Sequence, residues 1–173
     1  RKKDKYDGVF GIWYGKGPGV DRAGDALKHV NLAGTSKFGG VIALMGDDHI
    51  CESSTTSHQS EFAMIDAMIP FLNPSGVQEI LDYGIIGIEL SRKSGCWVGI
   101  KCVHDNVSSG ATVDLDENRV VLKDISEENY PSDGLNIRLK DTAQEKEYRL
   151  HHHKLKYVKD YCKVNNLNRL IFD

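Results

Sequence analysis

The side chains best suited to chemistry gather directly after a short apolar run at residues 41–45. They are titratable or able to bind ligands, and they are Asp47, Asp48, His49, Cys51, Glu52, His58 and Gln59. The run before them does not alternate between apolar and polar residues, which predicts a parallel strand covered on both faces. Ligands of open parallel sheets bind just beyond the carboxyl ends of the strands. The loop after residue 45 is therefore the first candidate for a functional site.

Two interpretations of this loop remain open. In one, His49 orients a carbonyl group or transfers a proton near neutral pH. In the other, the loop is a hydrogen-bonded connection in which Ser53 or Thr55 caps the following helix. A zinc site would use His49, Cys51 and His58, but these residues lack the paired spacing of zinc ligands and a fourth partner. We therefore predict no metal site.

A glycine-rich stretch at residues 15–19 also has two interpretations. Backbone N–H groups of a glycine loop before a helix can bind an anion. The spacing fits neither the dinucleotide-binding nor the P-loop pattern, however, and a plain turn requires the same glycine and proline residues. Farther along, the adjacent histidines 151–153 point in different directions on a helix, which favours a solvated face over a metal site.

The apolar runs and the helical spacings between them predict an α/β fold. Strands are expected at residues 9–14, 41–45 and 96–103, with a very short one at 71–72, and helices near 21–33, 62–69 and 73–90. This order predicts a three-layer domain with a mainly parallel sheet and helices on both faces. The strand at residues 9–14 is expected to be buried.

The second part of the chain has a different composition and hydrophobic pattern. Residues 108–140 combine turn residues, acids and short alternating segments, which predict a small peripheral hairpin. We expect a C-terminal helix with Lys154 on its solvated face and an edge strand near residue 170. The chain is thus interpreted as one domain with a core at 1–107, a hairpin and loops at 108–140, and a helix and strand at 141–173.

The composition bears on partners and location. The 173 residues carry 22 basic and 25 acidic side chains, so a net charge of −3 gives no electrostatic footprint for nucleic acid or an anionic membrane. No secretory signal and no stretch near the roughly 20 apolar residues of a membrane span are visible, so we expect a cytoplasmic protein. The four cysteines lack ligand spacing and are expected as reduced thiols. Because the chain starts at Arg1, we expect a fragment of a longer protein.

Five segments resemble the bacterial long-chain indolepyruvate ferredoxin oxidoreductases. They are GIWYGKGPGVDR at 11–22, KHVNLAGTS at 28–36, GGVIALMGDDH at 39–49, ESSTTSHQSEF at 52–62 and LNPSGVQEILDYG at 72–84. The resemblance covers roughly residues 8–105 and weakens beyond residue 107. It implies a thiamine-diphosphate-binding fold, in which this chain is the later part of the pyrimidine-side domain.

The resemblance also implies an activity for the parent protein. Members of this family oxidatively decarboxylate indolepyruvate or another aryl pyruvate to an acyl-CoA, with thiamine diphosphate, magnesium and iron–sulfur clusters, and pass electrons to ferredoxin. The glutamate that activates their aminopyrimidine lies before this chain, and their G-D-G motif and cluster cysteines have no counterpart here. The fragment itself is therefore expected to be inactive and to bind no cofactor. Its expected partners are the remaining domains, 2-oxoacid, coenzyme A, ferredoxin and further copies of the parent chain.

The loop after residue 45 is expected to face the reactive ring of the cofactor and the 2-oxoacid. The expected catalytic residues are His49 and Asp48, and the expected cofactor-binding residues are Gly46, Asp47, Glu52, Ser53 and Ser54. His49 is the first choice because histidine titrates near neutral pH. In the alternative interpretation the domain is a non-catalytic interface and cofactor wall, for which aromatic residues Trp13, Tyr14 and Phe38 near the glycine loops are suited.

Overall fold

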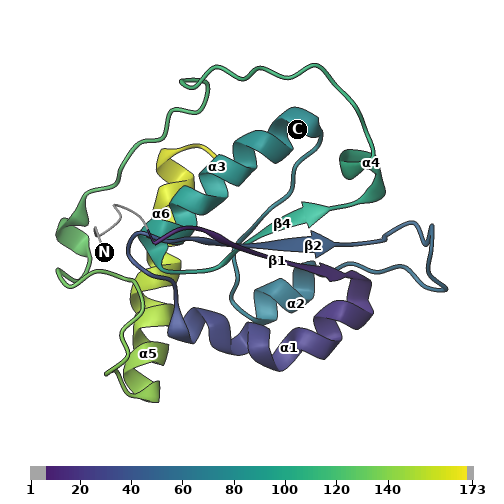
Figure 1. Ribbon diagram of the computed structural model, residues 1–173. Helices are drawn as coiled ribbons and strands as arrows, with labels where there is room; N and C mark the ends of the chain where they lie inside the picture. Colours follow the sequence, from purple (N-terminus) through teal and green to yellow (C-terminus); the bar gives the residue numbers. More distant parts are fainter. Residues whose placement is uncertain (1–6, 171–173) are drawn as a thin grey trace, which may run out of the picture.

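The computed structural model describes residues 7–170 and shows a four-stranded parallel sheet (Figure 1). The strands are β1 (Phe10–Gly15), β2 (Val41–Gly46), β3 (Phe71–Leu72) and β4 (Val98–Cys102). Their order in the sheet is β1-β2-β4-β3, and every neighbouring pair is parallel. The predicted mainly parallel sheet is thus confirmed for the described residues.

Helices cover both faces of the sheet, as the apolar runs predicted (Figure 1). The helices α1 (Lys16–Ala33) and α2 (Glu61–Asp66) lie on one face, and α3 (Val77–Ser94) lies on the other with α6 (Leu155–Val164) packed against it. Helix α1 begins at Lys16, so most of the glycine-rich stretch forms the first turn of that helix and not a loop.

Each face of the sheet has its own hydrophobic core. One core joins the strands to α1 and α2 through Tyr14, Val20, Leu27, Met45, Met64, Ala67 and Ile69. The other joins them to α3 and the C-terminal helices through Ile42, Leu90, Cys96, Val98, Ile100, Leu135, Leu150, Tyr157, Val158 and Tyr161. Because successive residues of β2 point to opposite faces, both cores need apolar side chains from it, which explains its unbroken apolar run.

Strand β1 lies at the edge of the sheet, and the prediction that it is buried was wrong. Its only neighbour in the described part of the chain is β2, and Phe10 and Trp13 are 57% and 72% exposed. Tyr14 is the one buried residue of this strand. A run of apolar residues does not reveal the position of its strand in the sheet, because an edge strand beside an uncovered surface has the same composition as a central one.

The predicted hairpin at residues 108–140 was also wrong. Between α4 (His104–Val107) and α5 (Ala143–Arg149), this segment runs as an extended trace around α3, with one short 3-10 helix, Glu127–Asn129 (Figure 1). Side chains accept hydrogen bonds from backbone N–H groups that would otherwise pair with a neighbouring strand. Asp114 accepts the N–H of Asp116 at 2.9 Å, and Gln78 accepts the N–H of Asp114 at 2.7 Å. Such local bonds compete with sheet formation.

The C-terminal helix spans α5, a π-helical turn at Leu150–Lys154 and α6. Lys154 is only 3% exposed, so its predicted place on the solvated face was wrong. It follows the buried Leu150 by four positions and therefore faces the same side of the helix. Its ammonium group donates to the carbonyl of Asn31, 3.0 Å away in the last turns of α1, where cations are favourable. The predicted edge strand at 170–172 falls largely outside the described residues.

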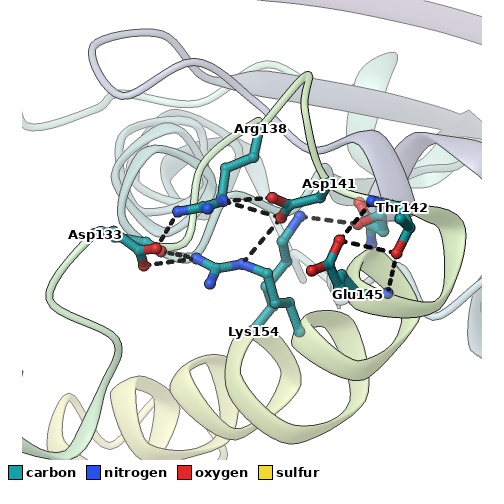
Figure 2. A network of polar contacts seen from close by, with 9 residues as sticks. Asp133, Arg138, Asp141, Thr142, Glu145 and Lys154 are labelled. Carbon is teal, nitrogen blue, oxygen red and sulfur yellow. Dashed lines mark hydrogen bonds and ion pairs between the residues drawn. The ribbon is translucent and has the colours of Figure 1, made fainter.

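A network of ion pairs fastens the segment before α5 to that helix (Figure 2). Arg138 donates from Nε to both carboxylate oxygens of Asp141, at 2.8 and 2.9 Å, and from Nη1 to Asp133. Thr142 and Glu145 form a reciprocal capping box at the first turn of α5. The segment therefore ends in a fixed geometry although it contains no strand. Among residues 7–170, no helix is long and apolar enough to cross a membrane.

Replacing Gly95 by alanine is predicted to destabilise this arrangement. Gly95 ends α3 with φ +69°, and a Cβ there would lie 2.2 Å from the carbonyl oxygen of Leu135. The left-handed conformation and the overlap should together cost about 2 kcal/mol or more of the free energy of unfolding, measured with urea. Gly84→Ala is the control, because its Cβ meets nothing within 4 Å and should be neutral or stabilising. Equal effects of both changes would contradict this account.

Candidate functional site

The loop between β2 and α2 extends beyond the carboxyl ends of the strands (Figure 1). Its two ends are joined by Asp47, which is 7% exposed and accepts hydrogen bonds from the N–H of Ser60, at 2.9 Å, and from its hydroxyl. The N–H of Asp47 also donates to the carbonyl of Cys102 at 2.9 Å. Asp47 thus links the end of β2 to β4 through its backbone N–H and to the start of α2 through its carboxylate.

Asp48 organises the inside of the loop. Its Oδ1 accepts the N–H of Glu52 at 2.8 Å, and its Oδ2 accepts the N–H of Ser53 at 3.0 Å. The ammonium group of Lys16 lies 3.3 Å from Oδ2. The Ser53 hydrogen bond, then that of Glu52 and the interaction with Lys16, outweigh burial and lower the pKa of Asp48 to about 2. Asp48 is therefore an ionised group with its oxygens occupied.

The loop is clamped onto the first turn of α1. Lys16 donates to the carbonyl oxygen of Ser53 at 2.7 Å and also to its hydroxyl. Asp48 and His58 exchange two backbone hydrogen bonds, of 3.3 and 2.9 Å, as an isolated antiparallel bridge. The ring of His58 rests against Gly17, where a Cβ would lie 2.3 Å from its Nδ1. Glycine at this position allows the close approach.

The other predicted site residues lie in the same region. Glu52 pairs with His104, the first residue of α4, whose Nδ1 is 3.0 Å away. Gly46 ends β2 against the Trp13 ring, and a Cβ there would lie 2.6 Å from Trp13 Nε1. Ser54 is half-buried in the loop. The structure thus brings together the residues singled out at residues 46–54, and the carboxylates of Asp47 and Asp48 bind other parts of the loop.

Beneath the loop, a row of side chains crosses the sheet on the α2 face. Tyr14 of β1 is in register with Met45, which is in register with Lys101 of β4. Lys101 is 8% exposed and forms an ion pair with Oε1 of Glu61, the first residue of α2. A lysine inside a sheet needs such a partner, because an unpaired buried charge is very costly.

Burial and neighbouring charges set the protonation of this row. Burial alone would raise the pKa of Glu61, but the hydrogen bond and charge of Lys101, with a smaller effect of His49, hold that pKa below its ordinary value. Burial raises the pKa of the Tyr14 phenol against the opposing effect of a Ser60 hydrogen bond, and the charges of Asp47 and Glu61 raise it further. The row therefore holds an ionised carboxylate beside a protonated phenol.

Three buried polar atoms in this region have no hydrogen-bond partner among the described residues. They are Tyr14 Oη, His49 Nδ1 and Glu61 Oε2. The hydroxyl of Ser60, which donates to Asp47, also lies close enough to the Tyr14 phenol to lower its pKa. Buried polar groups are nearly always satisfied, so three exceptions at one edge of a sheet need an explanation. They are donors and acceptors at the carboxyl end of the sheet that no described residue satisfies.

Sequence reasoning missed Lys101, Glu61 and Tyr14 as parts of the site. Lys101 gave a usable signal, because a charged residue interrupts the apolar run VGIKC one position before its end. Glu61 gave none, since an acid in the first turn of a helix is also common for electrostatic reasons alone. Only the register of the strands places Tyr14 in one row with Lys101, with Met45 between them.

Comparisons of the chain with protein-family profiles, with curated proteins and with solved structures gave no match. The site must therefore be interpreted from its own residues. Across residues 7–170, no three His, Cys, Asp or Glu side chains are arranged to hold a metal ion. The four cysteines, which include Cys51 in the loop, are free thiols.

Asp48→Asn is predicted to reduce the dependence of stability on acid pH. The folded pKa of about 2 lies below the ordinary 3.8, so the carboxylate stabilises the fold above about pH 4 and loses this effect as the pH falls through 2. The variant should be less stable at pH 7, and its deficit should shrink between about pH 4 and pH 2. Urea unfolding at several pH values measures this, with the exposed Asp21→Asn as control. A deficit that does not change with pH would contradict the prediction.

Proposed function

We propose that this chain is the later part of the pyrimidine-side domain of a thiamine-diphosphate-dependent 2-oxoacid ferredoxin oxidoreductase. The observation that carries the proposal is the set of three unpartnered buried atoms, Tyr14 Oη, His49 Nδ1 and Glu61 Oε2, at the carboxyl end of a parallel sheet. They lie within and beside the segments that resemble the indolepyruvate ferredoxin oxidoreductases. The parent protein would be a cytoplasmic oxidoreductase that acts on indolepyruvate or another aryl pyruvate.

The charges at the carboxyl end of the sheet suit a pyrimidine ring better than a diphosphate. Its basic groups Lys16 and Lys101 are already paired with Asp48 and Glu61. Asp47 adds a further carboxylate, so no excess of positive charge is left for a diphosphate. A neutral heterocycle instead needs directed donors and acceptors, and this is what the unpartnered atoms offer. Magnesium, the diphosphate and the iron–sulfur clusters are assigned to other parts of the parent protein.

The proposed reaction converts a 2-oxoacid anion and coenzyme A into an acyl-CoA, carbon dioxide, a proton and two electrons, which ferredoxin accepts. When bound, thiamine diphosphate supplies the nucleophilic carbon and the carbanion stabilisation that decarboxylation requires. The residues of this chain bind and orient the reactants. His49 is proposed to hold the carbonyl oxygen or move a proton, and the loop fixed by Asp47 and Asp48 excludes water.

Each predicted site residue keeps a part in this proposal. Asp48 acts through the loop geometry and not as a free base, because its oxygens are occupied. Gly46, Glu52, Ser53 and Ser54 form the wall beside the cofactor. The remaining domains of the parent chain, further copies of it and ferredoxin are the proposed partners. No nucleic acid or membrane is proposed.

Calorimetric titration with thiamine diphosphate and magnesium tests the proposal that other parts of the parent protein hold the diphosphate and magnesium. The chain of residues 1–173 should show no submicromolar binding and should not oxidise indolepyruvate. The full-length product of the parent gene should bind the cofactor and reduce ferredoxin or a viologen dye with indolepyruvate and coenzyme A. Tight binding by this chain alone, or an inactive and cofactor-free parent protein, would contradict the proposal.

His49→Ala in the parent protein should lower the turnover number by about 10²- to 10⁴-fold, the usual contribution of a positioned acid–base group. The melting temperature should change little, because Nδ1 of His49 has no partner to lose among the described residues. His29→Ala is the matched control, since His29 is an exposed histidine on α1. A lowered melting temperature with unchanged turnover would assign His49 to the scaffold.

A second function, a non-catalytic interface and cofactor wall, is favoured by the exposed aromatic residues. Trp13 is 72% exposed on β1, and Phe62 and Ile65 on α2 are 80% and 61% exposed. Large exposed apolar side chains mark interaction surfaces where they form one continuous patch. In this case the His49→Ala variant would keep its turnover, whereas Trp13→Ser or Phe62→Ser would impair assembly of the parent protein.

A further inference from the structure

Glu52 and His104 form an ion pair between two segments at the carboxyl end of the sheet. Oε2 of Glu52 lies 3.0 Å from Nδ1 of His104. Glu52 belongs to the loop after β2, and His104 is the first residue of α4, which follows β4 (Figure 1). The strands β2 and β4 are neighbours in the sheet, so the contact joins the segments that follow two adjacent strands. Ligands of open parallel sheets bind in this position.

Hydrogen bonds fix the backbone on both sides of the pair. The N–H of Glu52 donates to Oδ1 of Asp48 at 2.8 Å. On the other side, Asn106 is 4% exposed, and its Oδ1 accepts the N–H of Val103, the residue before His104, at 2.9 Å. Its Nδ2 donates to a carbonyl oxygen of β4 at 3.2 Å. The two side chains therefore start from backbone positions that the fold determines.

The contact leaves one nitrogen of the His104 ring open. Nδ1 faces the carboxylate of Glu52, whereas Nε2 has no hydrogen-bond partner among residues 7–170. The side chains of His104 and Glu52 are 56% and 48% exposed, so solvent and a substrate can reach the ring. A carboxylate accepts hydrogen bonds, so in the neutral ring Nδ1 carries the proton and Nε2 is the basic nitrogen. An imidazole base oriented by a third group has this arrangement.

A nearby hydroxyl would give the opposite tautomer if it were the dominant partner. Oγ of Ser108 lies 3.4 Å from Nδ1 of His104, and a hydroxyl that donates there would leave Nδ1 without a proton. Glu52 is the nearer partner, and hydrogen bonds to a carboxylate are shorter and stronger than those between neutral groups. The geometry therefore favours Glu52 as the residue that sets the tautomer.

The proposed reaction has a proton for such a base to take. The 2-oxoacid enters as an anion, so the proton that the reaction releases comes from the thiol of coenzyme A. A thiolate is the reactive nucleophile, and a base must remove this proton before the sulfur attacks the acyl group. The carboxylates of Asp47 and Asp48 are each occupied by two hydrogen bonds. His104 has an open ring nitrogen and is exposed to solvent, to which it can return the proton.

We propose that His104 is the general base for the thiol of coenzyme A and that Glu52 is its positioning residue. The S–H bond breaks as Nε2 takes the proton, the electron pair stays on sulfur, and sulfur then bonds to the acyl carbon. The carboxylate of Glu52 stabilises the imidazolium that forms, and the ring passes its proton to water. The two electrons of the oxidation go to ferredoxin and not through this pair. The role in thiol activation rests on the function proposed above, whereas the tautomer of His104 does not.

The tautomer of His104 can be measured in the chain without a cofactor, because the contact with Glu52 is already present there. At alkaline pH, where histidine rings are neutral, nitrogen-15 shifts distinguish Nδ1–H from Nε2–H. His104→Gln identifies the signal among the seven histidines. The test variant is Glu52→Ala, and Ser108→Ala is the matched control because it removes the other group near Nδ1. Both positions are exposed, so both variants should fold, and circular dichroism verifies this.

The expected result is an Nδ1–H ring at His104 in the wild type and in Ser108→Ala. In Glu52→Ala the ring should change to Nε2–H, the form that a free neutral histidine prefers. An Nε2–H ring in the wild type, or an unchanged ring in Glu52→Ala, overturns the positioning role. A change of tautomer in Ser108→Ala also overturns it, because Ser108 would then be the residue that positions the ring.

Single-turnover measurements on the parent protein test the role of the base. His104→Ala should slow formation of acyl-CoA by about 10²- to 10⁴-fold, and Glu52→Ala by about 10- to 100-fold, as loss of an orienting partner does at metal-bound histidines. His104→Ala should slow release of carbon dioxide far less, because the acyl group exists only after carbon dioxide has left. His29→Ala, at an exposed histidine of α1, is the control and should slow neither step.

The two steps separate this inference from the proposed function. Equal slowing of both steps by His104→Ala, or no slowing of either, overturns the role of His104 and leaves the proposed function standing. A parent protein that does not oxidise indolepyruvate with coenzyme A overturns the proposed function and with it the thiol as the source of the proton. The tautomer measured in the chain then still decides whether Glu52 positions His104.

Discussion

The buried carboxylate of Asp47 is the constraint on which the carboxyl end of the sheet depends. A charge that is 7% exposed must find hydrogen bonds inside the protein, and Asp47 finds them at the N–H and hydroxyl of Ser60. These bonds hold the start of α2 against the end of β2, so the loop between them must return on itself. The bridge between Asp48 and His58 and the clamp by Lys16 then follow from a loop whose ends are already fixed.

The sequence could predict those features of the fold that a short stretch of residues determines, and not those that depend on the whole chain. The unbroken apolar run of β2 marks a strand between two layers, because each face needs apolar side chains, and the sheet was therefore predictable. The edge position of Trp13 was not, because neighbour order is a property of the whole chain. Leu115 alternates with polar residues as in a strand, but it is exposed and has no core to face. Lys154 was placed by its charge, whereas its spacing from Leu150 decided its burial.

The site illustrates the same limit. Polar residues after a strand were enough to locate it, since the carboxyl end of a parallel sheet is where loops meet. The sequence could not show which polar atoms are satisfied: Asp47 and Asp48 resembled free acids and are engaged, whereas His49 retains an unpartnered nitrogen. That distinction depends on distances between residues far apart in the chain, and so did the pairing of Lys101 with Glu61.

The pattern of engaged and free groups also says what kind of ligand this edge can hold. Lys16 and Lys101 are both neutralised within the protein, so an anionic ligand would have to break an existing ion pair. Breaking a buried pair leaves an uncompensated charge and is strongly unfavourable. A neutral ring or a carbonyl group can bind without breaking an ion pair, because it can form hydrogen bonds with the unpartnered Nδ1 of His49 and Oη of Tyr14. The edge is therefore suited to orient an uncharged group by hydrogen bonds, and any strongly anionic part of the same ligand must be held elsewhere.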